Sequence, residues 1–298
     1  MTSPGPRIPE VSAPVVTVLG TGTMGAGMVR SLRRAGLSVR VWNRDGAKAR
    51  ALADVGAEAF DTPAEAAVGA DVVLTMLLDA DSVIEAIRRA APAAGTVWLQ
   101  CATVGLGGVD RTIAVAEELG LVLVDCPVQG TRKPAEEGAL VLLASGSERA
   151  RAELAPVFEA LGRKTLWLGE AGAGSRLKLV CNAWVFALLA GVAQSVALAR
   201  GLGLDPRDFF SAIEGGHLDA PYAHVKGAAM AAGDYQVSFS LAGAMKDNRL
   251  IREALASAAV PDRLTAAILE TMEAAADRVD PTAVDMAVLI EGLTSPPG

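Results

Sequence analysis

The sequence contains few of the residues that build metal, disulfide and zinc sites. Its 298 residues include only two histidines, three cysteines and 4% aromatics. Cys101, Cys126 and Cys181 lie far apart and form no C-x-x-C pair, which indicates reduced thiols rather than a disulfide or zinc framework. No cluster of His, Cys and carboxylate residues has the spacing of metal ligands, so we expect no metal. No G-x-S-x-G motif is present, which disfavours a serine hydrolase.

Positive charge is also scarce, since the formal net charge is −7. Bulk attraction to nucleic acid or to an anionic membrane is therefore not expected, and any phosphate site has to be a local feature. The most apolar stretch, residues 177–198, has the length of a membrane span, but Lys178, Asn182 and Gln194 interrupt it. We expect a buried central helix there instead, in a protein of the cytoplasm.

The chain is rich in short apolar runs that alternate with helical segments. The expected strands are residues 15–19, 38–42, 71–78, 96–100, 122–125 and 140–144. Such alternation is typical of βαβ units in a parallel sheet. After residue 174 only helical patterns remain, over 174–202, 206–215, 221–231, 239–258, 261–278 and 282–293. The sequence predicts a Rossmann-type doubly wound α/β domain over 14–171, an all-α domain over 172–298, and a disordered leader over 1–13.

A glycine-rich turn follows the first expected strand. Gly20, Gly22 and Gly25 form a G-x-G-x-x-G motif that also contains Thr23 and Met24. The first glycine permits a tight turn, the second lets a pyrophosphate approach the backbone, and the third lets the helix pack against the strand. Because the motif links an apolar strand to a helix, it predicts a dinucleotide site at the helix N-terminus.

The end of the second strand bears on the choice of cofactor. NAD enzymes usually place an acidic residue here to bind the ribose 2′-hydroxyl, whereas this strand ends in Asn43 and Arg44. The planar guanidinium of Arg44 suits a 2′-phosphate, and Lys48 adds a second cation. Asp45 is adjacent, but it can cap the next helix. The pattern favours NADP(H) over NAD(H); the alternative is that Arg44 is only a solvated charge.

Lys178 and Asn182 are spaced i, i+4 on an otherwise apolar helix, so they share one face. Burial lowers the pKa of a lysine amine, which suits proton transfer near neutral pH. The alternative is a lysine whose stem is buried and whose ammonium reaches water. Composition alone leaves both interpretations open.

Four motifs together resemble the β-hydroxyacid dehydrogenases, the family of 3-hydroxyisobutyrate dehydrogenase. They are the glycine loop VTVLGTGTMGAGM, the run DCPVQGT at 125–131, the motif G-x-G-x-x-x-K-x-x-x-N at 172–182, and the segment from Phe239 to Asp247. The run TRKPAEEG at 131–138 is similar to the glyoxylate/succinic semialdehyde reductase branch, whose members use NADPH to reduce small aldehyde acids.

The resemblance implies roles for individual residues. Lys178 would be the general acid and Asn182 would position the substrate. Gly130 and Thr131 would bind the substrate carboxylate, and Gln129 beside them would belong to the same substrate-binding set.

The same resemblance implies contacts at the nicotinamide end of the site. Lys246 would close over this end and touch both substrate and cofactor. Thr103 would lie near the nicotinamide, and Leu77, at the end of the third expected strand, is assigned to the cofactor set.

Two departures from the family pattern bear on the substrate. Gln129 stands where the family has serine, and Ala102 replaces the serine of an S-T-V turn.

Taken together, the motifs and the resemblance lead us to expect a homodimeric NADPH-dependent reductase acting on a small carbonyl compound, with no nucleic-acid or membrane partner. Two alternatives remain: an imine reductase, which shares the architecture but carries Asp or Tyr in place of the lysine, and a non-catalytic NADP-binding protein.

Overall fold

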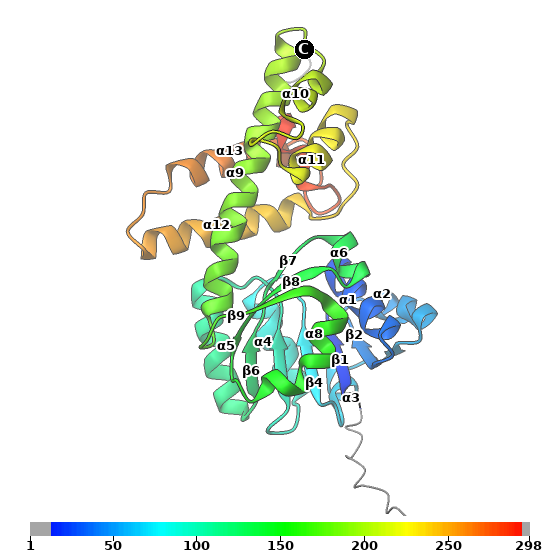
Figure 1. The fold of residues 1–298 in the computed structure, drawn as a ribbon. Coiled ribbons are helices and arrows are strands. Elements are labelled where there is room, and N and C mark those ends of the chain that lie inside the picture. Colours follow the sequence, from blue (N-terminus) through cyan, green and yellow to red (C-terminus); the bar gives the residue numbers. More distant parts are fainter. Residues whose placement is uncertain (1–12, 294–298) are drawn as a thin grey trace, which may run out of the picture.

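The computed structural model describes residues 13–293. Except for Ala13, the expected leader lies outside the described residues. The chain folds into a sheet flanked by helices, followed by a group of helices arranged around one long helix (Figure 1).

Six parallel strands form the first part of the sheet. They are β1 (Val15–Leu19), β2 (Ser38–Trp42), β3 (Glu58–Ala59), β4 (Val72–Thr75), β5 (Val97–Gln100) and β6 (Val122–Asp125). Their order is β3-β2-β1-β4-β5-β6, so the chain winds outward in both directions from β1 and β4. This order confirms the doubly wound prediction and creates a crevice where the winding reverses, at the carboxyl ends of the strands.

The sheet then continues with the expected strand at 140–144, which is β8, and with two strands that were not expected, β7 and β9. β8 (Leu140–Gly146) pairs antiparallel with β6 and with the short β7 (Val128–Gln129), and parallel with β9 (Gly162–Trp167). β7 and β9 are short or half-exposed, so neither carries the long apolar run of a buried strand. The parallel prediction therefore holds for the first six strands and for the β8–β9 pair, and it fails where β8 meets β6 and β7.

Helices cover both faces of this sheet. They are α1 (Thr23–Arg34), α2 (Gly46–Arg50), α3 (Pro63–Ala67), α4 (Ala80–Ala90), α5 (Gly105–Leu119), α6 (Arg132–Glu137), α7 (Ala150–Glu153) and α8 (Ala155–Leu161), with the 3-10 helix η1 (Ala51–Val55). Two apolar cores result, one on each face. Fully buried Val18 and Leu74 belong to one core, and Leu19 and Val73 to the other. Neighbouring strand residues thus point to opposite faces, which fixes the sheet between two helical layers.

The second half is helical. Its elements are α9 (Ala173–Gly201), α10 (Pro206–Ile213), α11 (Pro221–Ala232), α12 (Leu241–Ser257), α13 (Arg263–Ala276) and the 3-10 helix η2 (Met286–Leu293). Among the described residues of this half, the only β-pairing is an isolated bridge between Ser240 and Asp285. A third core, which includes Phe186, Leu189 and Met272, joins α9 to the helices around it.

α9 connects the two halves. It begins beside β8, packs on α5, and continues upward as the axis of the helical group (Figure 1). Among described helices, only α9 is long and apolar enough to cross a membrane by length and composition, and 39% of that stretch is buried inside the chain. The expected burial is therefore partial: one face packs inward, while Val180, Trp184 and Leu198 lie on an exposed face.

Candidate active site

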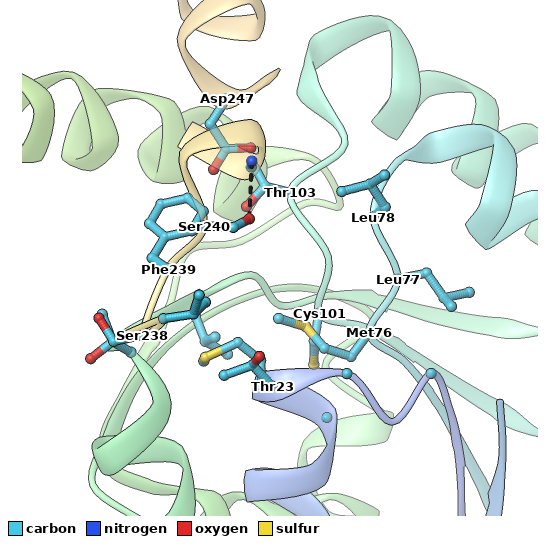
Figure 2. Close-up of a pocket in the computed structure, with 18 of the residues that line it drawn as sticks. Thr23, Met76, Leu77, Leu78, Cys101, Thr103, Ser238, Phe239, Ser240 and Asp247 are labelled. Carbon is cyan, nitrogen blue, oxygen red and sulfur yellow. Dashed lines mark hydrogen bonds between the residues drawn. The ribbon is translucent and has the colours of Figure 1, made fainter. Parts of the chain in front are cut away.

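A cavity of about 480 Å³ lies at the carboxyl ends of the parallel strands, between the glycine loop and α12. Figure 2 shows Thr23 of α1 on one side and Phe239, Ser240 and Asp247 on the other. The cavity therefore combines residues from both halves of the chain, as expected for a crevice at a reversal of strand order.

The glycine loop is shaped by contacts that exclude side chains. A Cβ on Gly20 would lie 2.3 Å from the carbonyl oxygen of Met76, and one on Gly25 would lie 1.9 Å from that of Gly20. A Cβ on Gly22, by contrast, would meet nothing within 4 Å, because this residue borders open space in the cavity. Gly22 precedes α1 as its N-cap and makes no side-chain cap bond. The uncapped N–H groups and the free space fit a dinucleotide pyrophosphate.

The region after β2 is organised by Asn43, which lines the cavity. Its Oδ1 accepts a hydrogen bond from the backbone N–H of Thr21 at 3.0 Å. Asp45 caps α2 by accepting from Ala47 N at 3.1 Å, so its carboxylate is engaged away from the cavity. Lys48 lines the cavity, whereas Arg44 is exposed outside its lining. Arg44 makes no hydrogen bond or ion pair within residues 13–293, which leaves its guanidinium available.

Lys178 lies on α9 and lines the cavity. Only 9% of the residue is exposed, and its Nζ donates to the backbone oxygen of Val128 at 2.7 Å. Burial lowers the pKa of this amine to about 8, against an opposing effect of the negative charge of Asp247. The side chain is therefore a buried amine held by a protein carbonyl, with a pKa closer to neutral pH than that of an exposed lysine.

Asn182 does not line the cavity, but its partner does. Its Nδ2 donates to Oδ2 of Asp247 at 2.8 Å, and the other oxygen of Asp247 lies 2.7 Å from the Nζ of Lys246. Lys246 also donates to the backbone oxygen of Thr103 at 2.6 Å. This chain of contacts ties α9, α12 and the loop after β5 together above the cavity.

The predicted substrate-binding run is divided by the pleat of β7. Val128, Gly130 and Thr131 line the cavity, whereas Gln129 between them does not. Alternate strand residues point to opposite sides, and Gln129 sits in β7 opposite Val141. Its Nε2 is buried without a hydrogen-bond partner among the described residues. The glutamine thus borders the site from behind rather than forming its wall.

All but one of the residues predicted to bind the cofactor line the cavity. Its lining includes the predicted residues Gly20, Gly22, Thr23, Met24, Gly25, Asn43, Leu77, Thr103 and Lys246. Of the residues assigned to cofactor, substrate and catalysis, only Arg44, Gln129 and Asn182 lie outside the lining.

Sequence reasoning missed a polar segment that precedes α12. Ser238, Phe239 and Ser240 line the cavity, and Asp285 holds this segment in place. Its Oδ2 accepts from the backbone N–H groups of Ser238 at 2.9 Å and Phe239 at 3.1 Å, while its Oδ1 pairs with buried Lys226 at 2.6 Å. The motif that contains Phe239 could have drawn attention to this segment, but no local signal identifies Asp285 as its anchor.

A second missed residue, Asp125, fixes the start of α9. Its two carboxylate oxygens accept from the backbone N–H of Ser175 at 2.8 Å and from the Ser175 hydroxyl at 2.7 Å. Burial raises the pKa of Asp125, although these hydrogen bonds act in the opposite direction. Gly174 permits the close packing, because a Cβ there would lie 2.1 Å from the oxygen of Leu143. Asp125 therefore determines where Lys178 enters the cavity, one turn further along α9.

Comparison with known proteins assigns both halves of the chain. Residues 15–169 match the NAD-binding domain of 6-phosphogluconate dehydrogenase, and residues 172–293 match the NAD-binding domain of NADP-dependent 3-hydroxyisobutyrate dehydrogenase. The chain belongs to the 3-hydroxyisobutyrate dehydrogenase family. It is an NAD(P)-dependent oxidoreductase acting on CH–OH donors.

Three relatives illustrate the range of this family and fold. Glyoxylate/succinic semialdehyde reductase 2 of Arabidopsis thaliana is 31% identical over 84% of this chain and 71% of its own length. The structure of Mycobacterium tuberculosis 3-hydroxyisobutyrate dehydrogenase with L-serine is 27% identical, with a TM-score of 0.83 over 95% of this chain and 99% of that one. An imine reductase from Pseudomonas sp. shares the fold, at 23% identity and a TM-score of 0.64 over 95% and 100% of the two chains.

Proposed function

We propose that this protein is an NADPH-dependent reductase of small carbonyl acids, which it converts to hydroxy acids with Lys178 as the general acid. The observation that carries the proposal is the buried amine of Lys178, whose pKa is lowered to about 8 beside the cofactor cavity. Similarity to a glyoxylate/succinic semialdehyde reductase supports the substrate class.

Bound NADPH supplies the hydride. The Lys178 ammonium, oriented by the backbone oxygen of Val128, donates a proton to the carbonyl oxygen as negative charge develops there. In the reverse direction the neutral amine removes that proton. Asn182 acts through Asp247, whose negative charge helps to keep Lys178 protonated.

The substrate carboxylate binds at the start of α6. Thr131 precedes this helix as its N-cap and has no side-chain cap bond, so its hydroxyl is free to bind a ligand. Gly130 has a φ of 129°, a conformation that glycine accommodates readily, and it turns the backbone along the cavity. Together they supply hydroxyl and amide donors for an anion.

The preference for NADPH rests on the end of β2. Arg44 makes no hydrogen bond or ion pair with any residue in 13–293, and Lys48 lies nearby in the cavity lining. Two cations, with no carboxylate turned toward the cavity between them, favour a 2′-phosphate over a 2′-hydroxyl. The capping bond of Asp45 supports the same preference, because it directs that carboxylate to α2.

We further propose that the enzyme is a cytoplasmic homodimer with no membrane or nucleic-acid partner. Trp184 and Val180 are each 67% exposed on α9 in the single chain. Exposed apolar side chains along one helix are typical of a surface that a second copy covers. Light scattering coupled to size exclusion measures this directly: a dimer supports the proposal, and a monomer at micromolar concentration contradicts it.

Imine reduction is the second candidate, because an imine reductase shares the fold over 95% of this chain. A buried amine suits protonation of an alkoxide, and for this reason we place carbonyl reduction first.

One assay tests both functions. Oxidation of NADPH by the purified protein is measured with glyoxylate, succinic semialdehyde and a cyclic imine. We expect turnover of an aldehyde acid, and a kcat about 10³-fold lower for Lys178→Met with little change in NADPH affinity. The exposed Lys133→Met variant is the matched control and should retain full activity. Activity on the imine alone, or wild-type kcat in Lys178→Met, would contradict the proposal.

A further inference from the structure

A second cavity, of about 280 Å³, lies on the nucleotide-binding half, between α7, α8 and β9. It shares no lining residue with the active-site cavity. Among the described strands, β9 pairs only with β8, so the cavity lies at a free edge of the sheet. The residues that determine its chemistry are Arg151, Phe158, Glu159, Arg163, Lys164 and Trp167.

The lining concentrates positive charge in a protein whose net charge is −7. Arg151, Arg163 and Lys164 converge on the cavity, and Glu159 is the carboxylate in its lining. Arg163 and Lys164 form no ion pair within the described part of the chain, while Arg151 pairs loosely with Glu148 at 3.6 Å. On a protein with a negative net charge, a hollow lined by cations that lack carboxylate partners is a local region of positive charge.

A residue that lines the same cavity carries an unpartnered donor. The Nε1 of Trp167 is buried and has no hydrogen-bond acceptor among residues 13–293. An indole N–H can only donate, and buried donors in folded proteins nearly always have a partner. The ring itself is held firmly, with Phe158 at 6.1 Å between centroids and the Arg151 guanidinium 5.8 Å above its face. This donor therefore lacks the acceptor that buried N–H groups normally have, and an anion bound in the cavity is one source of such an acceptor.

We propose that this cavity binds a small oxyanion, a molecule carrying phosphate or carboxylate groups. Arg163 and Lys164 supply charge, and the Trp167 N–H donates to one anion oxygen. At roughly 30 Å³ per water molecule, the volume suits a small polyanion rather than a dinucleotide. The lining carries three cations against the single carboxylate of Glu159, so its charge is positive overall. The Glu159 carboxylate repels larger anions that would extend as far as this residue.

Trp167 also supplies the measurement. The protein, saturated with NADP⁺ so that the cofactor site is filled, is titrated with pyrophosphate and separately with citrate, while tryptophan fluorescence is recorded. Sodium chloride at equal ionic strength corrects for screening. We expect a saturable change at a Kd of about 1 mM or below with at least one anion, and no such change in Trp167→Phe. Pyrophosphate alone would indicate a phosphate ligand, and citrate alone a polycarboxylate.

The cations are tested by a matched pair of double variants. Arg163→Ser/Lys164→Ser removes the pair in the cavity, and Arg132→Ser/Lys133→Ser removes an identical Arg-Lys pair from α6. We expect the first to weaken binding at least about tenfold and the second to leave it within about twofold. Calorimetric titration extends the comparison to Trp167→Phe, where the fluorescence signal is lost, and it should show weaker binding there. No saturable response beyond that of sodium chloride, or equal effects of the two double variants, would overturn the proposal.

Discussion

The two sides of the active-site cavity are built in different ways. The cofactor side consists of backbone shaped by glycine, and its key contact joins Gly20 to Gly25, five positions further on in one motif. The catalytic side consists of side chains that meet across long stretches of sequence. Lys178 and Val128 are 50 residues apart, and Lys246 and Thr103 are 143 apart. A local motif can therefore specify the first side, while only the complete fold assembles the second.

Two glycine substitutions on the cofactor side should have different effects, one on stability and the other on cofactor binding. The first of them, Gly25→Ala, should have the largest effect on stability. Gly25→Ala forces a Cβ to within 1.9 Å of a backbone oxygen that cannot move away, so it should cost about 3 kcal/mol or more of unfolding free energy. Gly22→Ala meets no atom within 4 Å, so the melting temperature should hardly change while the KM for NADPH rises, since the new methyl occupies pyrophosphate space. Thermal unfolding and cofactor titration of both variants measure this. Equal destabilisation by the two would contradict the contrast.

This contrast also explains what the sequence could predict. The strand 15–19 and the glycine turn were located correctly because an apolar run and a glycine spacing are local signals. The doubly wound order followed from alternation of strands and helices. The antiparallel strand β8 and its edge partner β9 were not anticipated as such, because pairing direction depends on how distant segments meet.

The same limit applies within the site. Lys178 could be singled out because a lysine on an apolar helix is unusual. The roles of Asp125 and Asp285 could not, since each aspartate acts through hydrogen bonds to residues about 50 positions away. Gln129 was expected in the substrate-binding set because of its place in a motif. In β7, however, neighbouring residues point to opposite sides, and Gln129 lies outside the cavity lining. A motif comparison does not show to which side a residue points.

The anchor of α9 provides the next test on the catalytic side. Asp125→Ala leaves the buried N–H and hydroxyl of Ser175 without acceptors, which should cost about 2–3 kcal/mol. Because Lys178 follows one turn later, kcat should fall together with stability. Asp81→Ala, which removes an exposed carboxylate paired with Arg111, should change stability by no more than about 0.5 kcal/mol. Denaturant unfolding distinguishes them, and an Asp125→Ala variant as stable as wild type would refute the anchoring role.

The pH dependence of turnover tests the amine itself. On the proposed mechanism, alcohol oxidation requires the neutral form of Lys178, so kcat should rise about tenfold per pH unit and level off above a pKa of about 8. In reduction the ammonium is required, and kcat should fall above the same pH. Asp247→Asn removes the negative charge that raises the pKa of Lys178, so the midpoint should move to lower pH.

The free energy of unfolding should also depend on the protonation of Lys178, and it should increase with pH. The pKa of Lys178 is lower in the folded protein than the ordinary 10.5, so folding releases a proton between pH about 8 and 10.5, and stability should rise with pH across that window. Lys178→Met should remove this rise.

The Asp247→Asn prediction has its own contradicting outcome. If the midpoint of the pH–rate profile stayed fixed in that variant, Asp247 and Lys178 would not interact.

The smallest effect is expected at the outer edge of the cofactor side, where we propose that Arg44 selects NADPH over NADH. Arg44→Ser should raise the KM for NADPH about tenfold, through loss of charge-assisted hydrogen bonds to the 2′-phosphate, and leave that for NADH nearly unchanged. Arg30→Ser, which removes an exposed arginine paired with Asp54 on α1, is the control and should alter neither value. Steady-state kinetics with both cofactors provides the measurement. If Arg44→Ser affected NADPH and NADH equally, Arg44 would be acting on the shared part of the dinucleotide, and cofactor choice would have to come from Lys48 and the backbone around Asn43.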